Sequence, residues 1–316
     1  MSAGSEPRAA RAGADALAQT EAALARAFAA GGVSARLHAI DLDSGAELAL
    51  DPDAPVVSAS VFKLPVLVEL CRQASAGTVS LTQRVPIPVG FTPTDGGIGL
   101  SAMLDDVELS LRDLALMMMS ISDNRATDVI MALLGREQIN ATMREHGFPG
   151  TVLEGDCAYL YATMEEDLGE PYDDIPPQRY AERFDAIRAM RAVTAPLTNR
   201  TTARETTRLL AALWRDELLD AAGSAEARRI LGLQIWPHRL AAGFPDDAIR
   251  VSGKTGTIAH LRSEAGVVEH PDGGRCAVAV FISSSTPAAR NPAADRAIGE
   301  AARIAVDHLR SIRGCS

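Results

Sequence analysis

Lysine is nearly absent from this sequence. Among 316 residues and 31 basic side chains of lysine and arginine, only Lys63 and Lys254 are lysines. Arginine does not lose its proton in proteins, whereas a lysine whose pKa is lowered can act as a base. Because arginine supplies positive charge everywhere else in the chain, these two lysines are candidates for a chemical role.

Metal-binding and redox motifs are also missing. The six histidines form no H-E-x-x-H pattern, and the four cysteines show neither C-x-x-C pairs nor metal-ligand spacing. We therefore expect no metal and no other cofactor. The cysteines are Cys71, Cys157, Cys276 and Cys315.

Two further shortages limit the partners. Aromatic residues make up only 4% of the chain, which disfavours platforms for stacking nucleic-acid bases. The net charge of −10 and a pI near 5.1 disfavour nucleic acids and anionic membranes as partners. No run of about 18 apolar residues occurs, so no membrane-spanning helix is predicted. A small molecule is the expected partner, and the oligomeric state is not predicted.

The N-terminal residues 1–8 lack the charged n-region and the apolar h-region of a secretory signal peptide. This absence predicts a cytoplasmic protein with reduced thiols. A secreted protein whose leader had been removed would show the same start, so both locations stay open.

The first lysine lies in an S-x-x-K motif formed by Ser60 and Lys63. The apolar run at 61–71 predicts a buried helix, and residues three apart on a helix share one face. The Lys63 amine can therefore reach the Ser60 hydroxyl and take its proton, so that the serine oxygen attacks a carbonyl carbon. The backbone N–H of Ser60, which is unpaired at a helix start, can serve as one donor of an oxyanion hole.

The second motif is S-D-N at residues 122–124. Ser122 is expected to pass a proton to the leaving nitrogen or oxygen of the substrate. Asn124 is expected to hydrogen-bond the substrate amide and to help hold Lys63.

The second lysine opens a K-T-G motif. Lys254 and Thr255 predict a strand-borne cation and hydroxyl that bind a substrate carboxylate. Gly256 removes a side chain so that the substrate can lie along the strand. The N–H of Thr257 is expected to be the second donor of the oxyanion hole.

Each motif alone has an ordinary structural explanation. S-x-x-K occurs by chance in many chains, S-D-N is a common turn or helix cap, and K-T-G is a common strand end. All three in this order, with two of them holding the only lysines, favour a catalytic site. Ser58 is a competing nucleophile by proximity, but Val61 occupies its +3 position, so no base lies at helical spacing from it.

Helical and strand patterns occur in blocks along the chain. Apolar periodicity and helix-end signals predict helices at 14–30, 61–71, 111–121, 125–134, 136–145, 201–219, 225–233 and 291–312. Apolar runs between turn residues predict strands at 36–42, 46–50, 249–252, 263–270 and 276–283. Because strands lie only near the two ends of the chain, we predict an α/β sandwich, with one antiparallel sheet flanked by helices and an inserted all-helical domain.

This pattern predicts two domains. Residues 14–57 and 205–316 form the sheet domain, and residues 58–204 form the helical domain, which includes an irregular, expanded loop at about 150–200. Residues 1–13 are predicted to be disordered. The three motifs map to the walls of the cleft between the domains, where ligands commonly bind.

The three motifs in this order are those of the penicillin-recognising serine enzymes. Over nearly its whole length the chain resembles class A β-lactamases and related serine hydrolases, which implies a β-lactamase/transpeptidase-like fold. Arg262 is a candidate for binding a substrate carboxylate, and a plain surface arginine at a strand end is an equally good explanation. Besides the motifs, the resemblance rests on D-G-G-I-G-L at 95–100, L-R-D-L at 111–114, D-N-R-A-T-D at 123–128, T-T-A-R-E at 201–205 and R-S-E-A-G-V-V at 262–268.

The chain departs from this family in the omega loop. The resemblance implies a glutamate in an E-x-x-L-N motif shortly before the T-T helix start, where it orients the water that hydrolyses the acyl-enzyme. Residues 188–200 contain no acid. The nearest E-x-x-L pattern starts at Glu165, farther upstream, whereas counting from the helix that ends at Gly147 places the position near Asp156 or Cys157. Glu165 and Asp156 are therefore alternative candidates for the hydrolytic base, and a solvated acidic loop is the third explanation.

Two other features lie near this region. All four tyrosines fall between residues 159 and 180. One of them could relay a proton or form a wall of the pocket, and packing within the expanded loop is the favoured explanation. His260, shortly after K-T-G, is a further candidate acid or base.

These observations predict a serine acyl hydrolase that resembles class A β-lactamases. It is expected to act through a Ser60 acyl-enzyme on a β-lactam or a related amide or ester that carries a carboxylate. If no glutamate activates water, two alternatives remain. One is a penicillin-binding protein that keeps its acyl group, and the other is a cytoplasmic esterase or acyltransferase that modifies a small metabolite.

Overall fold

The computed structural model describes residues 6–88, 98–286 and 290–313. Its strands are β1 (Val33–Asp41), β2 (Glu47–Leu50), β3 (Val56–Val57), β4 (Arg84–Ile87), β5 (Val107–Ser110), β6 (Arg200–Thr201), β7 (Arg250–Ile258), β8 (Leu261–Glu269) and β9 (Arg275–Ser284). Its α-helices are α1 (Glu6–Gly31), α2 (Lys63–Ser75), α3 (Leu111–Ser120), α4 (Asn124–Leu134), α5 (Arg136–Glu145), α6 (Cys157–Leu168), α7 (Phe184–Ala189), α8 (Ala203–Trp214), α9 (Ala221–Leu231) and α10 (Pro292–Arg313).

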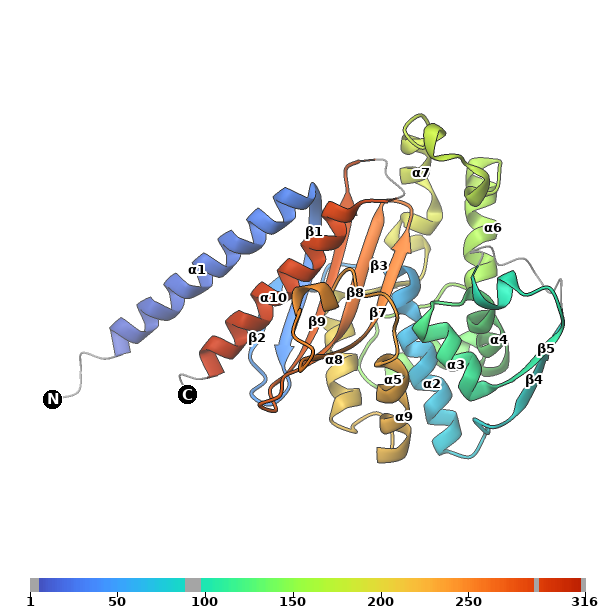
Figure 1. Cartoon of the computed structure of the whole chain (residues 1–316), viewed down its shortest axis with the longest axis horizontal. Coiled ribbons are helices and arrows are strands. Elements are labelled where there is room, and N and C mark those ends of the chain that lie inside the picture. The colour runs from blue at the N-terminus through green and yellow to red at the C-terminus, as the bar shows by residue number, and fades with distance from the viewer. Residues whose placement is uncertain (1–5, 89–97, 287–289, 314–316) are drawn as a thin grey trace.

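A five-stranded antiparallel sheet in the order β2-β1-β9-β8-β7 forms the centre of the protein. Helices cover both of its faces (Figure 1). This confirms the predicted fold, an antiparallel sheet flanked by helices with helical segments between the two groups of strands. Residues 95–97 of the D-G-G-I-G-L sequence lie outside the described residues.

Strand β9 lies in the middle of the sheet and shows why both faces need a helical layer. Side chains alternate between the two faces of a strand. Val278 and Val280 pack in the core beneath α10, whereas Ala277 and Ala279 pack in the larger core with α2 and α8. Because both faces are buried, this strand appears in the sequence as a continuous apolar run.

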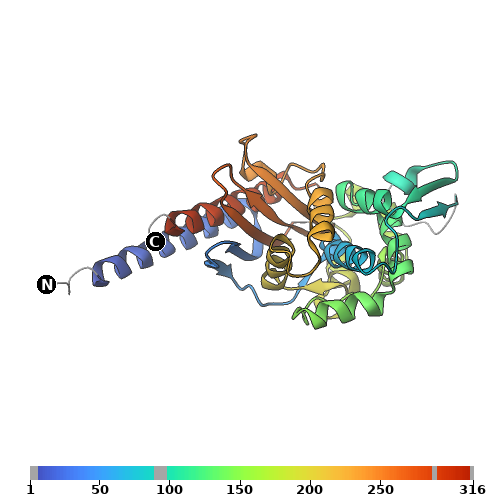
Figure 2. The same ribbon diagram turned by 90° about the horizontal axis from the view of Figure 1, so that it is seen from below.

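Helices α1 and α10 lie side by side on one face of the sheet in both views (Figures 1 and 2). A Cβ added at Gly31 would lie 2.8 Å from the Cβ of Ala297, so a small residue is needed where the two helices meet. Helix α1 begins at Glu6, and the prediction of disorder over residues 1–13 is therefore wrong for 6–13. Alanine-rich sequence with high helix propensity extends this helix.

The opposite layer is built around α2. Most residues of this helix are buried, and α3, α4, α5 and α9 all contact it. Helix α9 comes from the part of the chain assigned to the sheet domain, and it packs against α2 and α3 of the helical layer. The division into domains at 14–57 plus 205–316 and 58–204 stays a prediction. No helix in the described parts of the chain has both the length and the apolar character needed to cross a bilayer.

The segment predicted to be irregular at 150–200 contains helices α6 and α7 and several short 3-10 turns. It has a small hydrophobic core of its own, separate from the two main cores. Its fully or largely buried members include Met164, Ile175, Tyr180, Ile187 and Met190. Because its elements are short and pack mainly on one another, the segment shows little of the periodicity that marks longer helices.

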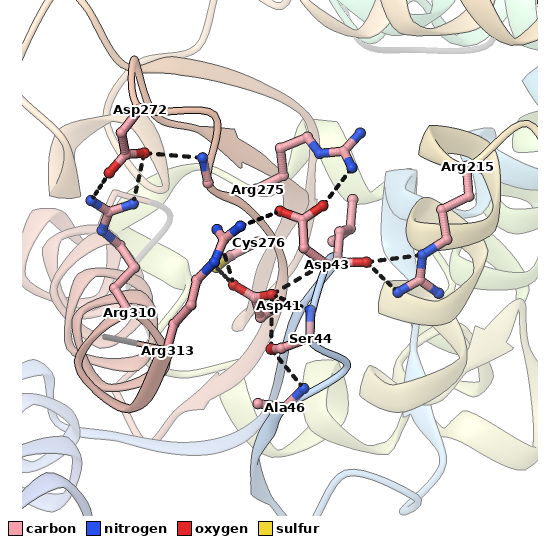
Figure 3. Close-up of polar contacts among 12 residues, drawn as sticks. Asp41, Asp43, Ser44, Ala46, Arg215, Asp272, Arg275, Cys276, Arg310 and Arg313 are labelled. Carbon is pink, nitrogen blue, oxygen red and sulfur yellow. Dashed lines mark hydrogen bonds and ion pairs between the residues drawn. The ribbon is translucent and has the colours of Figure 1, made fainter. Parts of the chain in front are cut away.

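A polar network fixes the end of α10 to the turn between β1 and β2 (Figure 3). The carboxylate of Asp41 is fully buried and accepts hydrogen bonds from the backbone N–H groups of Asp43 and Ser44 at 3.0 and 2.7 Å. Arg313 lies 3.8 Å from Asp41 and 2.9 Å from Asp43. Burial alone would raise the pKa of Asp41, but these hydrogen bonds and Arg313 outweigh it and hold the pKa below its usual value.

We predict that Asp41→Ala lowers the free energy of unfolding by about 3 kcal/mol, because it removes a buried carboxylate and leaves the N–H groups of Asp43 and Ser44 without their acceptor. Asp272→Ala is the matched control. It removes an exposed ion pair with Arg310 of the same helix, α10, and such pairs contribute about 1 kcal/mol or less. Urea unfolding of both variants measures the difference, and equal losses would contradict the structural role given to Asp41.

Candidate active site

Ser60 lies in a single 3-10 turn (Ala59–Phe62) that runs directly into α2 at Lys63. Ala59 has a positive φ of 42°, a conformation that costs a non-glycine residue on the order of 1–3 kcal/mol. Strand β7 presses against this turn, because a Cβ added at Gly256 would lie 2.9 Å from the Ser58 carbonyl oxygen and 3.2 Å from the Ala59 Cβ. The glycine expected to make room for substrate instead makes room for the segment that carries Ser60.

Lys63 is fully buried and directs its amine toward the S-D-N motif. Its Nζ donates to the Ser122 carbonyl at 2.7 Å, to the Asn124 Oδ1 at 2.7 Å and to the Ser122 Oγ at 3.2 Å. The predicted contact between Asn124 and Lys63 is thus present in the structure. The hydrogen bonds of Lys63 go to this motif rather than to the Ser60 hydroxyl.

The S-D-N turn is held in an unusual conformation. Ser122 has a positive φ of 65°, and the carboxylate of Asp123 fixes the residues on both sides of it. Asp123 caps α4 by accepting from the Ala126 N–H at 2.9 Å, and its other oxygen accepts from the Leu100 N–H at 2.7 Å. These bonds place the Ser122 hydroxyl between the two lysines.

Lys254 approaches the same hydroxyl from the sheet. Its Nζ donates to the Ser122 Oγ at 2.9 Å and to the Thr255 carbonyl at 2.8 Å. Ser60, Ser122 and Lys254 therefore come from the start of α2, the turn between α3 and α4, and strand β7. The structure brings together the three motifs that the sequence placed at one site.

Both lysines have pKa values below the ordinary value for lysine. Burial is the main cause for Lys63, and the nearby acidic groups only partly offset it. For Lys254, burial is again the main cause, and the positive charge of Lys63 lowers the pKa further. Because two ammonium groups this close repel each other, loss of a proton from the pair is favoured.

The free edge of β7 faces the site. The N–H of Thr255 points out of the sheet and donates to the Gln234 side chain at 2.7 Å. Backbone directions repeat every second residue in a strand, so the N–H and C=O of Thr257 point to the same open side. Thr257 therefore has the orientation expected of an oxyanion donor.

Two buried arginines lie close to this strand, and the sequence analysis named only Arg262 as a candidate for binding a carboxylate. The Arg262 side chain is 2% exposed, lies 3.5 Å from the Asp295 carboxylate and lines a separate cavity behind the Ser60 turn. Arg239 faces the site instead. It donates to the Thr257 Oγ1 at 2.7 Å and to the Gly256 carbonyl at 2.9 Å, and Asp295 holds its Nε at 2.8 Å.

Cys157 occupies the position beside Ser60 where a carboxylate was sought. It is the first residue of α6, is buried, and lines the same cavity as Ser60 and Asn124. The carboxylate of Asp128 accepts from the N–H groups of Cys157 and Ala158 at 2.8 and 3.0 Å and so anchors this end of α6. Burial raises the pKa of the Cys157 thiol well above its ordinary value, which keeps it neutral.

The two carboxylates predicted as hydrolytic bases lie elsewhere. Asp156 caps α6 by accepting from the Tyr159 N–H at 2.8 Å. Glu165 is exposed on α6, and neither residue lines a cavity next to Ser60. His260 does not line these cavities either; its ring packs edge-on against Phe184, and burial lowers its pKa to about 4.

Two cavities meet at Ser60. One, of about 450 Å³, is enclosed by the Ser60 turn, the end of β7, α6 and the short 3-10 turn at Tyr172–Asp174. The other, of about 290 Å³, lies on the side of Ser122 and is lined by Thr255, Trp236 and Arg239 among others. Both include Ser60, Asn124 and Thr257, so a molecule held at Ser60 can extend into each.

This arrangement of a serine, two buried lysines and an open strand edge agrees with a comparison to known families. A family model described as the beta-lactamase enzyme family matches residues 19–309. The chain belongs to this beta-lactamase enzyme family.

Individual relatives fit this assignment. The chain is 31% identical over 293 residues to the beta-lactamase regulatory protein BlaB of Streptomyces cacaoi, which covers 89% of this chain and 94% of that protein. The fold is similar to a beta-lactamase from Sphaerobacter thermophilus, with a TM-score of 0.73, 23% identity, and coverage of 92% of this chain and 97% of that one.

PBP-A is a further structural relative, with a TM-score of 0.72, 22% identity, and coverage of 92% of this chain and 96% of that one. A variant of PBP-A is known as an acyl-enzyme complex with penicillin G, with a TM-score of 0.72, 22% identity, and coverage of 94% and 97%. At these identities, the structural likeness establishes the fold.

Sequence reasoning missed Arg239 and underused Cys157. Arg239 lies 15 residues before Lys254 and is one of many arginines, so no local pattern marks it. Cys157 could have been identified from the sequence, because counting from Gly147 leads to it. In addition, Cys157-Ala158-Tyr159-Leu160 has the leucine of the expected E-x-x-L pattern. A search for acids passed over it because its side chain is a thiol.

We predict that Asp128→Asn changes the pH dependence of stability. Burial raises the pKa of Asp128 to about 6 in the folded protein, whereas an unfolded aspartate titrates near 3.9. The folded state therefore holds an extra proton between these values, and stability falls as pH rises from about 4 to 6. The variant should lack this loss, which amounts to up to about 3 kcal/mol.

Urea unfolding at pH 4, 5, 6 and 7 measures this effect. Asp105→Asn, at an exposed position, is the control and should follow the wild type. Parallel stability curves for the wild type and Asp128→Asn would show that Asp128 does not titrate in this range.

Proposed function

We propose that Ser60 forms a covalent acyl-enzyme with a β-lactam or a related amide or ester that carries a carboxylate. The observation that carries this proposal is the Ser122 hydroxyl, which lies 3.2 Å from the Lys63 amine and 2.9 Å from the Lys254 amine. This arrangement gives a path for a proton between the nucleophile side and the leaving-group side of the site.

The proposed step starts with a neutral Lys63. The lysine takes the proton of the Ser60 hydroxyl, and the serine oxygen forms a bond to the carbonyl carbon. The N–H groups of Ser60 and Thr257 stabilise the oxyanion. The bond between carbon and the leaving nitrogen or oxygen then breaks, and that atom receives a proton from Ser122, which is resupplied through the lysine pair.

The substrate carboxylate is assigned to the cavity on the Ser122 side. Thr255 and Arg239 line this cavity, and Lys254 lies behind it. A guanidinium and hydroxyl groups that line one cavity can provide charge-assisted hydrogen bonds for such an anion. Arg262, which is buried against Asp295, takes no part in this assignment.

We propose further that the acyl-enzyme is long-lived. Among the residues that line the cavity next to Ser60, the position at the start of α6 is held by the neutral thiol of Cys157. A neutral, buried thiol is a poor base for activating water. Hydrolysis is therefore slow, and the protein acts as a binder of β-lactams or passes its acyl group to another acceptor.

The relation to BlaB favours a second candidate function. BlaB is described as a regulatory protein of beta-lactamase. A β-lactam sensor would use the same acylation of Ser60 but signal from the acylated state instead of releasing product. Persistence of the acyl group is required for this function and is unfavourable for a hydrolase.

We predict that a cephalosporin adds its mass to the wild-type protein within minutes and that the adduct persists for hours. Ser60→Ala should form no adduct, because the nucleophile is gone. Intact-mass spectrometry over time measures both. An adduct on Ser60→Ala would exclude Ser60 as the nucleophile, and an adduct that clears while the drug is consumed would exclude the long-lived intermediate.

The double variant Cys157→Glu with Asp128→Asn tests the cause of this persistence. It places a carboxylate at the start of α6 and removes the neighbouring negative charge that would oppose it. The lifetime of the adduct should shorten at least tenfold. If the lifetime is unchanged, the thiol at this position is not what limits hydrolysis.

Absence of any cephalosporin adduct on the wild-type protein would direct the search for substrates to esters and peptides.

We predict that the acylation rate rises with pH and levels off well below the ordinary lysine pKa of about 10.4. The midpoint belongs to the Lys63–Lys254 pair, whose pKa values are lowered by burial and mutual repulsion. Lys63→Arg should acylate at least 100-fold more slowly and show no such rise, because arginine keeps its proton. Adduct formation measured between pH 5 and 10 tests this, and a normal rate for Lys63→Arg would remove Lys63 from its role.

A further inference from the structure

The larger cavity at Ser60 is built mainly by a segment that the sequence left unassigned. One face of α6 forms a wall of it through Cys157, Leu160, Tyr161 and Met164. These residues follow the spacing i, i+3, i+4 and i+7, which places them in one stripe along a helix. The stripe begins next to Ser60 and leads away from it.

The facing wall comes from residues 172–180. Tyr172, Ile175 and Tyr180 line the cavity, and the rings of Tyr172 and Tyr180 meet edge-to-face with centroids 5.8 Å apart. Ile258 and Ala259, at the end of β7, close the side next to the sheet. The cavity therefore has apolar or aromatic walls on three sides.

The segment that carries these walls is anchored from outside. Its own core buries Ile187 and Met190 completely behind the cavity wall. On the surface, Arg191 pairs with Glu166 and Asp167 of α6 at 2.7 and 2.8 Å. Because packing and ion pairs hold both walls, the cavity exists before any ligand enters it, which lowers the cost of ordering on binding.

Besides the hydroxyls of Tyr161, Tyr172 and Tyr180, the uncharged polar side chains that line this cavity lie at one end. Ser60, Asn124 and Thr257 mark the end where acylation would occur. Among the described residues that line the remainder, the one charged side chain is Asp173, which is exposed at the rim. A ligand group deep in this cavity would contact carbon, sulfur and tyrosine rings with their hydroxyls, and a negative charge there would meet no cation among the described residues that line it.

We propose that this cavity binds the acyl part of the substrate, and that this part is bulky, uncharged and largely apolar, with an aromatic ring or a branched chain. This inference rests on the proposed function, because it identifies the group that Ser60 would carry. A volume of about 450 Å³ lies in the range of cavities that hold drug-sized ligands. An acetyl group would leave most of the cavity unfilled.

Three p-nitrophenyl esters test the proposal: the acetate, the 4-phenylbutyrate and the hemisuccinate. Acylation of Ser60 is followed by mass spectrometry and nitrophenol release, with Ser60→Ala as the blank. We expect the phenylbutyrate to acylate at least tenfold faster than the acetate, and the anionic succinate no faster than the acetate. Equal rates for acetate and phenylbutyrate would overturn the proposal.

Met164→Trp fills the cavity and should reduce the preference for phenylbutyrate over acetate to less than threefold. Ala162→Trp is the matched control, because Ala162 lies on the exposed side of the same helix, and it should keep the full preference. Should Met164→Trp fail to fold, Tyr161→Ala, which removes a ring from the same wall, should lower the preference at least threefold. Variants that leave the preference unchanged would overturn the proposal.

A binding measurement separates this inference from the proposed function. Titration calorimetry of the Ser60→Ala protein with 4-phenylbutyramide and acetamide requires no acylation. We expect the phenyl compound to bind at least tenfold more tightly, and Met164→Trp to abolish the difference. If no ester labels Ser60 but this binding occurs, the acyl-enzyme proposal fails and the cavity assignment holds. Equal or absent binding of the two amides overturns the cavity assignment.

Discussion

Two buried lysine amines that meet at one hydroxyl are the central constraint of this protein. Burying an ammonium ion costs several kcal/mol, and placing a second one beside it adds repulsion. The cost is offset by carbonyl, amide and hydroxyl oxygens that receive every donated hydrogen bond of Lys63 and Lys254. The three contributing elements are α2, the α3–α4 turn and β7, so this contact joins the helical layer to the sheet. The same contact therefore also stabilises the packing of the helical layer on the sheet.

Local sequence predicted the features whose causes are local. The serine and lysine of S-x-x-K are three residues apart, with Ser60 in the 3-10 turn and Lys63 at the start of the helix that follows it, so spacing alone placed them in the same region. Helix 136–145 was predicted with the bounds that α5 has, because Gly135 and a change of periodicity mark its start. Strands β8 and β9 were found because they are buried on both faces and appear as apolar runs.

Features that depend on distant contacts were not readable. Gly256 is explained by the Ser58–Ala59 backbone, some 200 residues earlier in the chain, and not by the strand that contains it. Glu165 has the right residue type, but its direction depends on which face of α6 packs inward. Arg239 is distinguished from other arginines only by Asp295 and the carbonyl groups it reaches. In each case the chemistry of the residue was visible and its orientation was not.

Strand β7 is the last strand of the sheet, and an unpaired strand edge can recruit the edge of another molecule. Here α9 and the segment after it run beside this edge, and the N–H of Thr255 donates a hydrogen bond to the Gln234 side chain. Backbone groups stay accessible near Thr257, a stretch too short for a second chain to add a strand but long enough for one amide or ester group. The protein can thus offer a hydrogen-bonding edge to a small molecule while resisting edge-to-edge aggregation.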